Sequence, residues 1–203
     1  MKRTAPLLIV LSIFTLVGFG CTKLPTSSKT DTKDSASQSQ MDHRAILLDA
    51  KQQGLIMDTA EIDRMKDPSV IVQDSKTQKV SDVASLIASD TKTWSAAALA
   101  DVTGGNSFGL VHTHFQNGEF KLFATLGGLP VPQNGASYNG WLVKRGTDMK
   151  VLNTGTIELS GKQFVNTYLS AEDFSNYDFF VITLQSSSDS TQPGEHILEG
   201  VIR

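Results

Sequence analysis

Short apolar runs and clusters of turn residues alternate along the second half of the chain, from Trp94 to Arg203. The turn clusters contain Gly, Asn, Pro and Ser, and no long stretch between them has helical spacing. Many short strands spaced in this way are typical of an all-β sandwich or barrel. We expect strands near residues 96–102, 108–115, 119–126, 138–144, 151–158, 163–168, 179–185 and 195–202. Segment 93–203 is therefore predicted to be an antiparallel, Ig-like β-sandwich, which makes the protein mainly β.

One hairpin of this region can be placed in register from the sequence. Asn117-Gly118 is the strongest short signal for a two-residue hairpin loop, and it pairs Phe115 with Phe120. Side chains alternate along a strand, so one mostly apolar face, predicted to be the core, carries Val111, Thr113, Phe115, Phe120, Leu122, Ala124 and Leu126. The opposite face carries Leu110, His112, His114, Lys121, Phe123 and Thr125.

The segment around Trp141 makes a prediction about packing. Trp141 and Leu142 are neighbours on a predicted strand, so they point to opposite sides. One of them should be partly exposed or covered by the helical region that precedes the strands. We interpret Trp141 as a core residue rather than a ligand platform, because aromatic side chains dominate burial in small sandwiches. Gly140 would let a neighbouring chain approach closely.

A short helical region is expected over residues 42–92. Ile46, Leu47 and Ala50 fall at helical spacing, and Gly54 follows as a helix stop. The region is interpreted as an appendage packed on the β domain.

Two further short helices are predicted within this region. Asp58 precedes Glu61 by three residues, which is the spacing of a capping box at a helix start. Pro68 ends that helix. Ser81 is expected to cap another short helix that runs through Ile87.

The N-terminus has the order of a secretory signal peptide, residues 1–20. Lys2 and Arg3 precede an apolar stretch from Leu7 to Phe19. That stretch is too short for a bilayer core of ~30 Å, which needs about 20 apolar residues in a helix. The signal-peptide interpretation is therefore preferred to a membrane span.

Cys21 follows the apolar stretch directly and is the only cysteine of the chain. A lone cysteine at this place, with Gly20 before it, resembles the lipobox that lipoprotein signal peptidase cuts, although Gly18 and Phe19 stand where that motif usually has Leu and a small residue. We expect a covalent lipid such as palmitate on Cys21; the alternative is a free thiol in a signal peptide that is cut elsewhere. Residues 21–41 are rich in Ser and Thr, so they are predicted to form a disordered, flexible tether.

The strand region also contains sequence blocks that are similar to those of a known domain family. They are Gly127-Gly128-Leu129-Pro130, Tyr138, Gly140-Trp141-Leu142-Val143, Thr154-Gly155, and residues 181–184 and 193–200. In these blocks the chain resembles the C-terminal extracytoplasmic domain of RskA-type anti-sigma-K factors, over roughly residues 97–203. The resemblance implies a small β-sandwich outside the membrane, with Pro130, Tyr138, Gly140, Trp141 and Gly155 as its structural motif.

The chain is expected to depart from the anti-sigma plan in two respects. In that family a transmembrane helix links the domain to a cytoplasmic segment that binds sigma factor, and neither is expected here. A single cysteine also cannot supply the His-x-x-x-Cys-x-x-Cys zinc motif of many anti-sigma domains. The resemblance therefore implies the fold and the location of the domain, but not sigma-factor binding.

Several classes of function receive little support from the sequence. The net charge of −3 comes without a basic stripe, so we expect no nucleic-acid binding. There is no Gly-x-Ser-x-Gly nucleophile motif, and the carboxylates of Asp101, Glu172 and Asp173 have no paired spacing. The glycine-rich residues 104–109 join two predicted strands, whereas a phosphate-binding loop needs a following helix. We therefore expect no enzyme activity and no cofactor besides the lipid.

His112 and His114 are the most suggestive polar pair. Residues two apart on a strand point the same way, and two imidazoles so placed can ligate zinc or copper. A tight site normally needs three or four ligands. The alternative function is therefore an exported metal-binding protein that uses these two histidines, while exposed surface histidines are the simpler interpretation.

The leading hypothesis is a lipoprotein held in the cell envelope through its lipid, on the extracytoplasmic face of the cell membrane or in an outer membrane if the source has one. Its β domain would be a non-catalytic binding or regulatory module. The expected partner besides the membrane is an envelope protein.

Overall fold

The computed structural model of the chain describes residues 43–187 and 191–203. The predicted signal peptide, Cys21 and the predicted tether lie outside the described residues. A first helix spans residues 43–52, followed by α2 (Thr59–Met65) and α3 (Val83–Ile87). The strands are β1 (Ile71–Val72), β2 (Thr77–Gln78), β3 (Ser95–Asp101), β4 (Phe108–Gln116), β5 (Glu119–Gly127), β6 (Ser137–Lys144), β7 (Lys150–Thr156), β8 (Glu158–Ser160), β9 (Gln163–Ser170), β10 (Phe179–Gln185) and β11 (Glu195–Val201).

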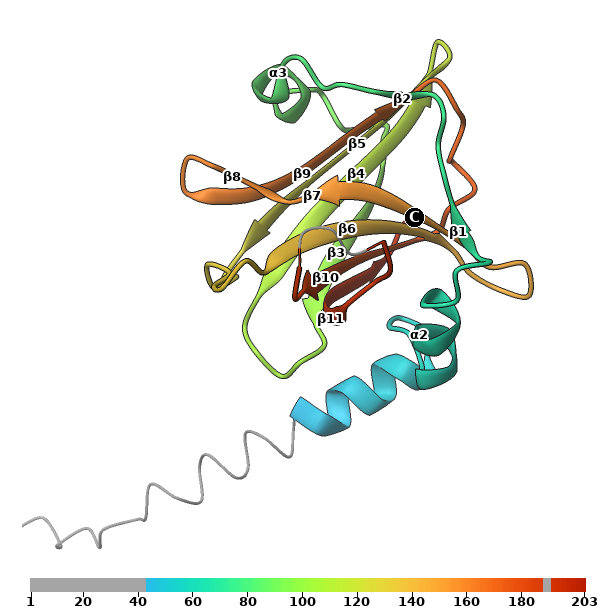
Figure 1. Cartoon of the computed structure of the whole chain (residues 1–203), viewed down its shortest axis with the longest axis vertical. Coiled ribbons are helices and arrows are strands. Elements are labelled where there is room, and N and C mark those ends of the chain that lie inside the picture. Colours follow the sequence, from blue (N-terminus) through green and yellow to red (C-terminus); the bar gives the residue numbers. More distant parts are fainter. Residues whose placement is uncertain (1–42, 188–190) are drawn as a thin grey trace, which may run out of the picture.

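The strands form one sheet in the order β1-β7-β6-β10-β11-β3-β4-β5-β9-β2, with β8 paired to β9. Figure 1 shows that this sheet curls strongly, so that β7 returns to the neighbourhood of β9. The expected mainly β fold is confirmed. Hydrogen bonds join the described strands into a single curled sheet, whereas a sandwich is built from two.

The strand pattern of the sequence agrees closely with the structure. In the β4–β5 hairpin, Phe115 pairs with Phe120 and Thr113 with Leu122, which confirms the predicted register. The expected strand 151–158 is divided into β7 and β8, because its first part pairs with β6 and its second part with β9. The two-residue strands β1 and β2 were not expected.

The interior of the curled sheet is the main hydrophobic core. The predicted inner face of the β4–β5 hairpin lies there, with Val111, Leu122 and Ala124 fully buried. The opposite face is less exposed than its sequence indicated, since Phe123 is 4% exposed. Trp94 packs edge-on against Phe123, with ring centroids 5.8 Å apart, and so covers part of that face.

A second apolar cluster lies on the outer side of the sheet, beneath α2. Trp141 is fully buried there against Met57 and Met65, whereas Leu142 is buried in the main core. This confirms that Trp141 is a core residue and that the helical region covers it. Arg145 adds a link, because its guanidinium donates a 2.8 Å hydrogen bond to the Gly54 carbonyl.

The short helices begin as the residue types dictate. Asp58 accepts a 2.8 Å hydrogen bond from the Glu61 amide, and the Glu61 carboxylate accepts one of 3.2 Å from the Asp58 amide. The predicted capping box is therefore confirmed. The cap of α3 is Asp82 rather than Ser81, and its carboxylate accepts from the Ser85 amide at 2.9 Å. An aspartate caps as well as a serine and its charge also favours a helix start.

The glycine-rich residues 104–109 lie in the connection between β3 and β4, residues 102–107, and at the start of β4, so they join two strands as expected. Asp101 organises this loop, because its carboxylate accepts from the amides of Thr103, Gly105 and Ser107 at 2.8–3.1 Å. The loop is thus fastened to its own strand.

Gly140 was expected to allow a close approach of a neighbouring segment, and the structure confirms it. The segments that approach it are strands β7 and β9 of the same chain. A Cβ atom at this position would lie 2.4 Å from Thr154 Oγ1 and 2.6 Å from Asn166 Oδ1. A side chain at residue 140 would therefore push apart β6, β7 and β9.

Gly140→Ala is expected to lower the free energy of unfolding by about 1–3 kcal/mol, because overpacked cores lose that much. Urea denaturation of the purified protein measures the loss. Gly127→Ala is the matched control: the three atoms nearest to its Cβ would all belong to the ring of Phe108, which is 63% exposed and can move aside. Equal stability of the two variants would contradict the proposed close contact.

Candidate binding cleft at the seam of the sheet

The ends of the curled sheet meet at a seam, which we define as residues 153–156 of β7 facing residues 166–168 of β9. On its edge toward β9, strand β7 pairs with β1 only at residues 151–152. On its edge toward β7, strand β9 pairs with β8 at 163–165 and with β2 at 169–170. Among the described strands, none pairs with the edges between these points. The seam therefore has strand pairing at both ends and none in the middle.

A single buried amide bridges the middle of the seam. Asn166 Nδ2 donates to the carbonyls of Thr154 and Gly155 at 3.3 and 3.2 Å, and Thr154 Oγ1 donates to Asn166 Oδ1 at 2.7 Å. Asn166 is 1% exposed, so these bonds replace water. The side chain thereby satisfies carbonyl groups that a neighbouring strand would otherwise have to satisfy.

A strap, defined here as residues 70–80, spans the seam at the end opposite to β8. Its strand β1 lies parallel to β7 and its strand β2 lies antiparallel to β9 (Figure 1). The Tyr168 hydroxyl of β9 donates a 2.5 Å hydrogen bond to the Asp74 carboxylate, which also accepts from Thr77 Oγ1 at 3.0 Å and from the Lys76 amide at 2.7 Å. One short segment thus holds both edges of the sheet.

These contacts shift the acidity of both partners. Burial alone would raise the pKa of Asp74, but hydrogen bonds from Ser170, Tyr168, Lys76 and Thr77 outweigh burial and lower it. Two effects raise the pKa of Tyr168: burial is the larger one, and the hydrogen bond to Asp74 is the second. Asp74 is therefore held as a carboxylate and Tyr168 as a phenol, the forms that bond to each other.

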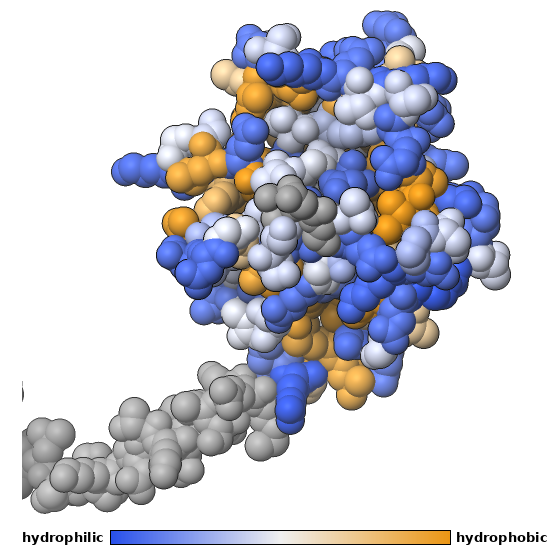
Figure 2. All heavy atoms as spheres, in the orientation of Figure 1, coloured by the Kyte–Doolittle hydropathy of each residue, from blue (hydrophilic) through white to orange (hydrophobic). Residues whose placement is uncertain are grey.

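A cavity of about 690 Å³ opens along the seam and the strap, and we name it the seam cleft. Most of the residues that line it carry uncharged amides or hydroxyls, among them Gln73, Gln78, Asn139, Asn153, Thr156 and Thr167, while carbon atoms make up about half of the wall surface. Two lining residues carry charge, Lys79 and Glu158, and their signs are opposite. In the orientation of Figure 1 the surface is largely hydrophilic, and its hydrophobic patches are separate from one another (Figure 2). The cleft is thus suited to an uncharged, hydrogen-bonding ligand.

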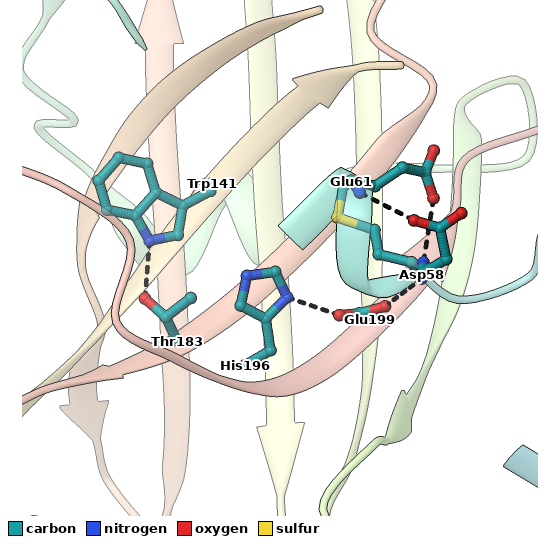
Figure 3. A network of polar contacts seen from close by, with 7 residues as sticks. Asp58, Glu61, Trp141, Thr183, His196 and Glu199 are labelled. Carbon is teal, nitrogen blue, oxygen red and sulfur yellow. Dashed lines mark hydrogen bonds and ion pairs between the residues drawn. The ribbon is translucent and has the colours of Figure 1, made fainter. Parts of the chain in front are cut away.

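A second polar group lies beneath the helical region (Figure 3). Glu199 of β11 is 1% exposed, accepts a 2.6 Å hydrogen bond from the Met57 amide, and lies 2.6 Å from His196 Nδ1. Close by, Trp141 Nε1 donates to Thr183 Oγ1 at 2.8 Å. The carboxylate thus ties the residue just before the α2 cap to the far end of the chain. Because it is enclosed, we interpret this group as structural.

The histidine pair does not converge on a common centre. His112 stacks on Phe123 and His114 stacks on Trp94, with centroid distances of 4.9 and 5.2 Å. Burial lowers the pKa of His112 below its ordinary value. Across residues 43–187 and 191–203, no three His, Cys, Asp or Glu residues are grouped so that they could hold a metal ion.

The other residues singled out in the sequence have structural contacts. Tyr138 donates its hydroxyl hydrogen bond to the Pro130 carbonyl at 3.2 Å, which links two blocks of the resemblance. Gly155 has a positive φ of 98°, and its amide is bonded to Asn153 Oδ1 at 2.7 Å. Cys21 lies outside the described residues.

Sequence reasoning missed Asn166, Asp74 and Glu199. One signal was present: asparagine is depleted in strands, yet Asn153 and Asn166 both stand inside predicted strands. An asparagine at such a position indicates a backbone group that needs a side-chain partner.

Comparison with protein-family models, with curated proteins and with solved structures finds no match to this chain. Within the described residues, no helix has the length and apolar character needed to span a bilayer.

Glu199→Ala is expected to lower the free energy of unfolding by about 3 kcal/mol or more, because it leaves a buried amide and a buried imidazole without their partner. Glu61→Ala is the control: it removes only the exposed half of the capping box and should cost about 1 kcal/mol or less. Chemical denaturation compares them. A cost for Glu199→Ala no larger than that for Glu61→Ala would refute the role given to this carboxylate.

Asp74→Asn should change the acid response of the protein. The folded pKa of Asp74 is lowered, so its contribution is complete above the unfolded pKa near 3.8 and is lost as the pH falls below it. At pH 7 the variant should be less stable by about 1 kcal/mol, since water screens a partly exposed carboxylate. Urea denaturation from pH 7 to pH 3 should show this difference shrinking with acidification. A difference that is independent of pH would exclude the mechanism.

Proposed function

We propose that the protein is a lipid-anchored, extracytoplasmic lipoprotein whose β domain is a non-catalytic binding module, and that it binds its partner in the seam cleft. The observation that carries the proposal is the cleft itself. Its volume, about 690 Å³, falls within the ~300–1,000 Å³ of small-ligand pockets. Its lining offers many hydrogen-bonding groups and few that could perform acid–base chemistry.

The arrangement of the cleft supports a binding role. A neighbouring strand, a buried amide and a strap connect its walls, and each connection limits how far the walls can move. Rigid sites bind more tightly because less conformational entropy is lost on association. The resemblance to an extracytoplasmic anti-sigma domain agrees with such a module outside the membrane.

The location is supported by the N-terminal sequence. An apolar stretch followed by Gly20-Cys21 and a Ser/Thr-rich segment is the arrangement of a lipoprotein signal and tether. Several acyl chains, each contributing ~0.8 kcal/mol per buried CH₂, make such an anchor permanent.

Replacement of Cys21 tests the anchor. Wild-type protein expressed in cells fed labelled palmitate should carry the label and sediment with membranes. Cys21→Ala should lose the label and leave the membrane fraction, while Ser28→Ala keeps both. An unlabelled wild-type protein would refute lipidation.

A photocrosslinking residue placed at position 78 tests the cleft. It should become crosslinked reproducibly to one component of the envelope, and the same residue at position 116, on the exposed β4–β5 turn, should not. Equal capture from both positions would show that the partner does not bind in the cleft.

A further inference from the structure

The lining of the seam cleft suggests the chemical class of its ligand. In the described part of the chain, the side chains of Gln73, Gln78, Thr156 and Thr167 line the cleft without a hydrogen-bond partner. An amide offers both donors and acceptors, and a hydroxyl offers one donor and two acceptors. These groups can therefore bind a molecule whose own groups donate and accept at once.

We infer that the seam cleft binds an uncharged, hydroxyl-rich ligand, namely a neutral glycan. This inference rests on the proposed binding function of the cleft and adds the class of ligand. A sugar hydroxyl donates and accepts together, which matches the lining amides and hydroxyls.

Charge in the cleft points to the same class. A site for an anionic ligand gathers Arg and Lys, since charge-assisted hydrogen bonds are the strong ones. Here Lys79 is balanced by Glu158, and the other lining residues are neutral. A strongly charged ligand of either sign would find no excess of opposite charge.

An extended peptide fits the cleft less well. A strand inserted at the seam would need ~4.7–4.9 Å to each neighbour, yet the one side chain of Asn166 already spans the gap to the Thr154 and Gly155 carbonyls. Peptides that add to a sheet also gain specificity from pockets for alternate side chains. The aliphatic side chains of the lining are those of Ile71, Val80 and Val83, and they do not alternate along one strand.

Titration of the purified full-length lipoprotein tests the inference. The probes are maltohexaose, cellohexaose and chitohexaose, with an uncharged hexapeptide of Ala and Ser for comparison. At least one oligosaccharide should bind and the peptide should not. Gln78→Ala and Thr167→Val should each weaken binding about five- to tenfold, the effect of one lost hydrogen bond. Gln116→Ala, the same truncation outside the cleft, should leave the affinity unchanged.

The possible outcomes separate this inference from the proposed function. If no oligosaccharide binds at millimolar concentration but the peptide does, with the same sensitivity to Gln78→Ala, the glycan is overturned and the binding cleft stands. If neither probe binds, or if binding ignores both cleft variants while thermal melts show them folded, the cleft is overturned as well. Palmitate labelling at Cys21 reports on the anchor independently of all these results.

Discussion

The structure depends on how the two ends of a curled sheet are closed. A strand edge exposes a row of unpaired amides and carbonyls, which costs free energy if buried and invites aggregation if left open. Here the β7–β8 segment changes partner from β6 to β9, the Asn166 amide bridges the middle, and a strap pairs with both edges. The space left between the β8 pairing, the Asn166 bridge and the strap is the seam cleft. The contacts that close the sheet therefore also form the candidate site.

The helical region illustrates a different constraint. The outer face of β6 and β10 carries large apolar side chains, including Trp141 and Phe179, which must be covered. Met57 and Met65 supply that cover, and Glu199 fixes its position through the Met57 amide. A buried carboxylate adds little net stability compared with an apolar core, but it accepts the amide in one geometry. We interpret it as specifying where the helical region docks.

Local features of this fold could be predicted from the sequence and long-range ones could not. Alternation and the Asn117-Gly118 turn are sufficient to predict the β4–β5 register, because both act over a few residues. The capping box of α2 is equally local. In contrast, the contact of Asn166 with Thr154 depends on where the β7–β8 segment changes partner from β6 to β9, which the strand pattern does not show, and Glu199 meets an amide 142 residues away. Strands of two residues, such as β1 and β2, are too short to show any period.

The strap also constrains the order of folding. Its residues leave the ribosome early, yet the segments of β7 and β9 that they pair with follow roughly 80–90 residues later. Contacts so distant along the chain form slowly, because the loop entropy is lost before the contact is gained. Until β9 has been made, the sheet has open edges and strand β2 of the strap has no partner. Closure is therefore expected to be the last step of folding, and the unclosed chain is the species most exposed to aggregation.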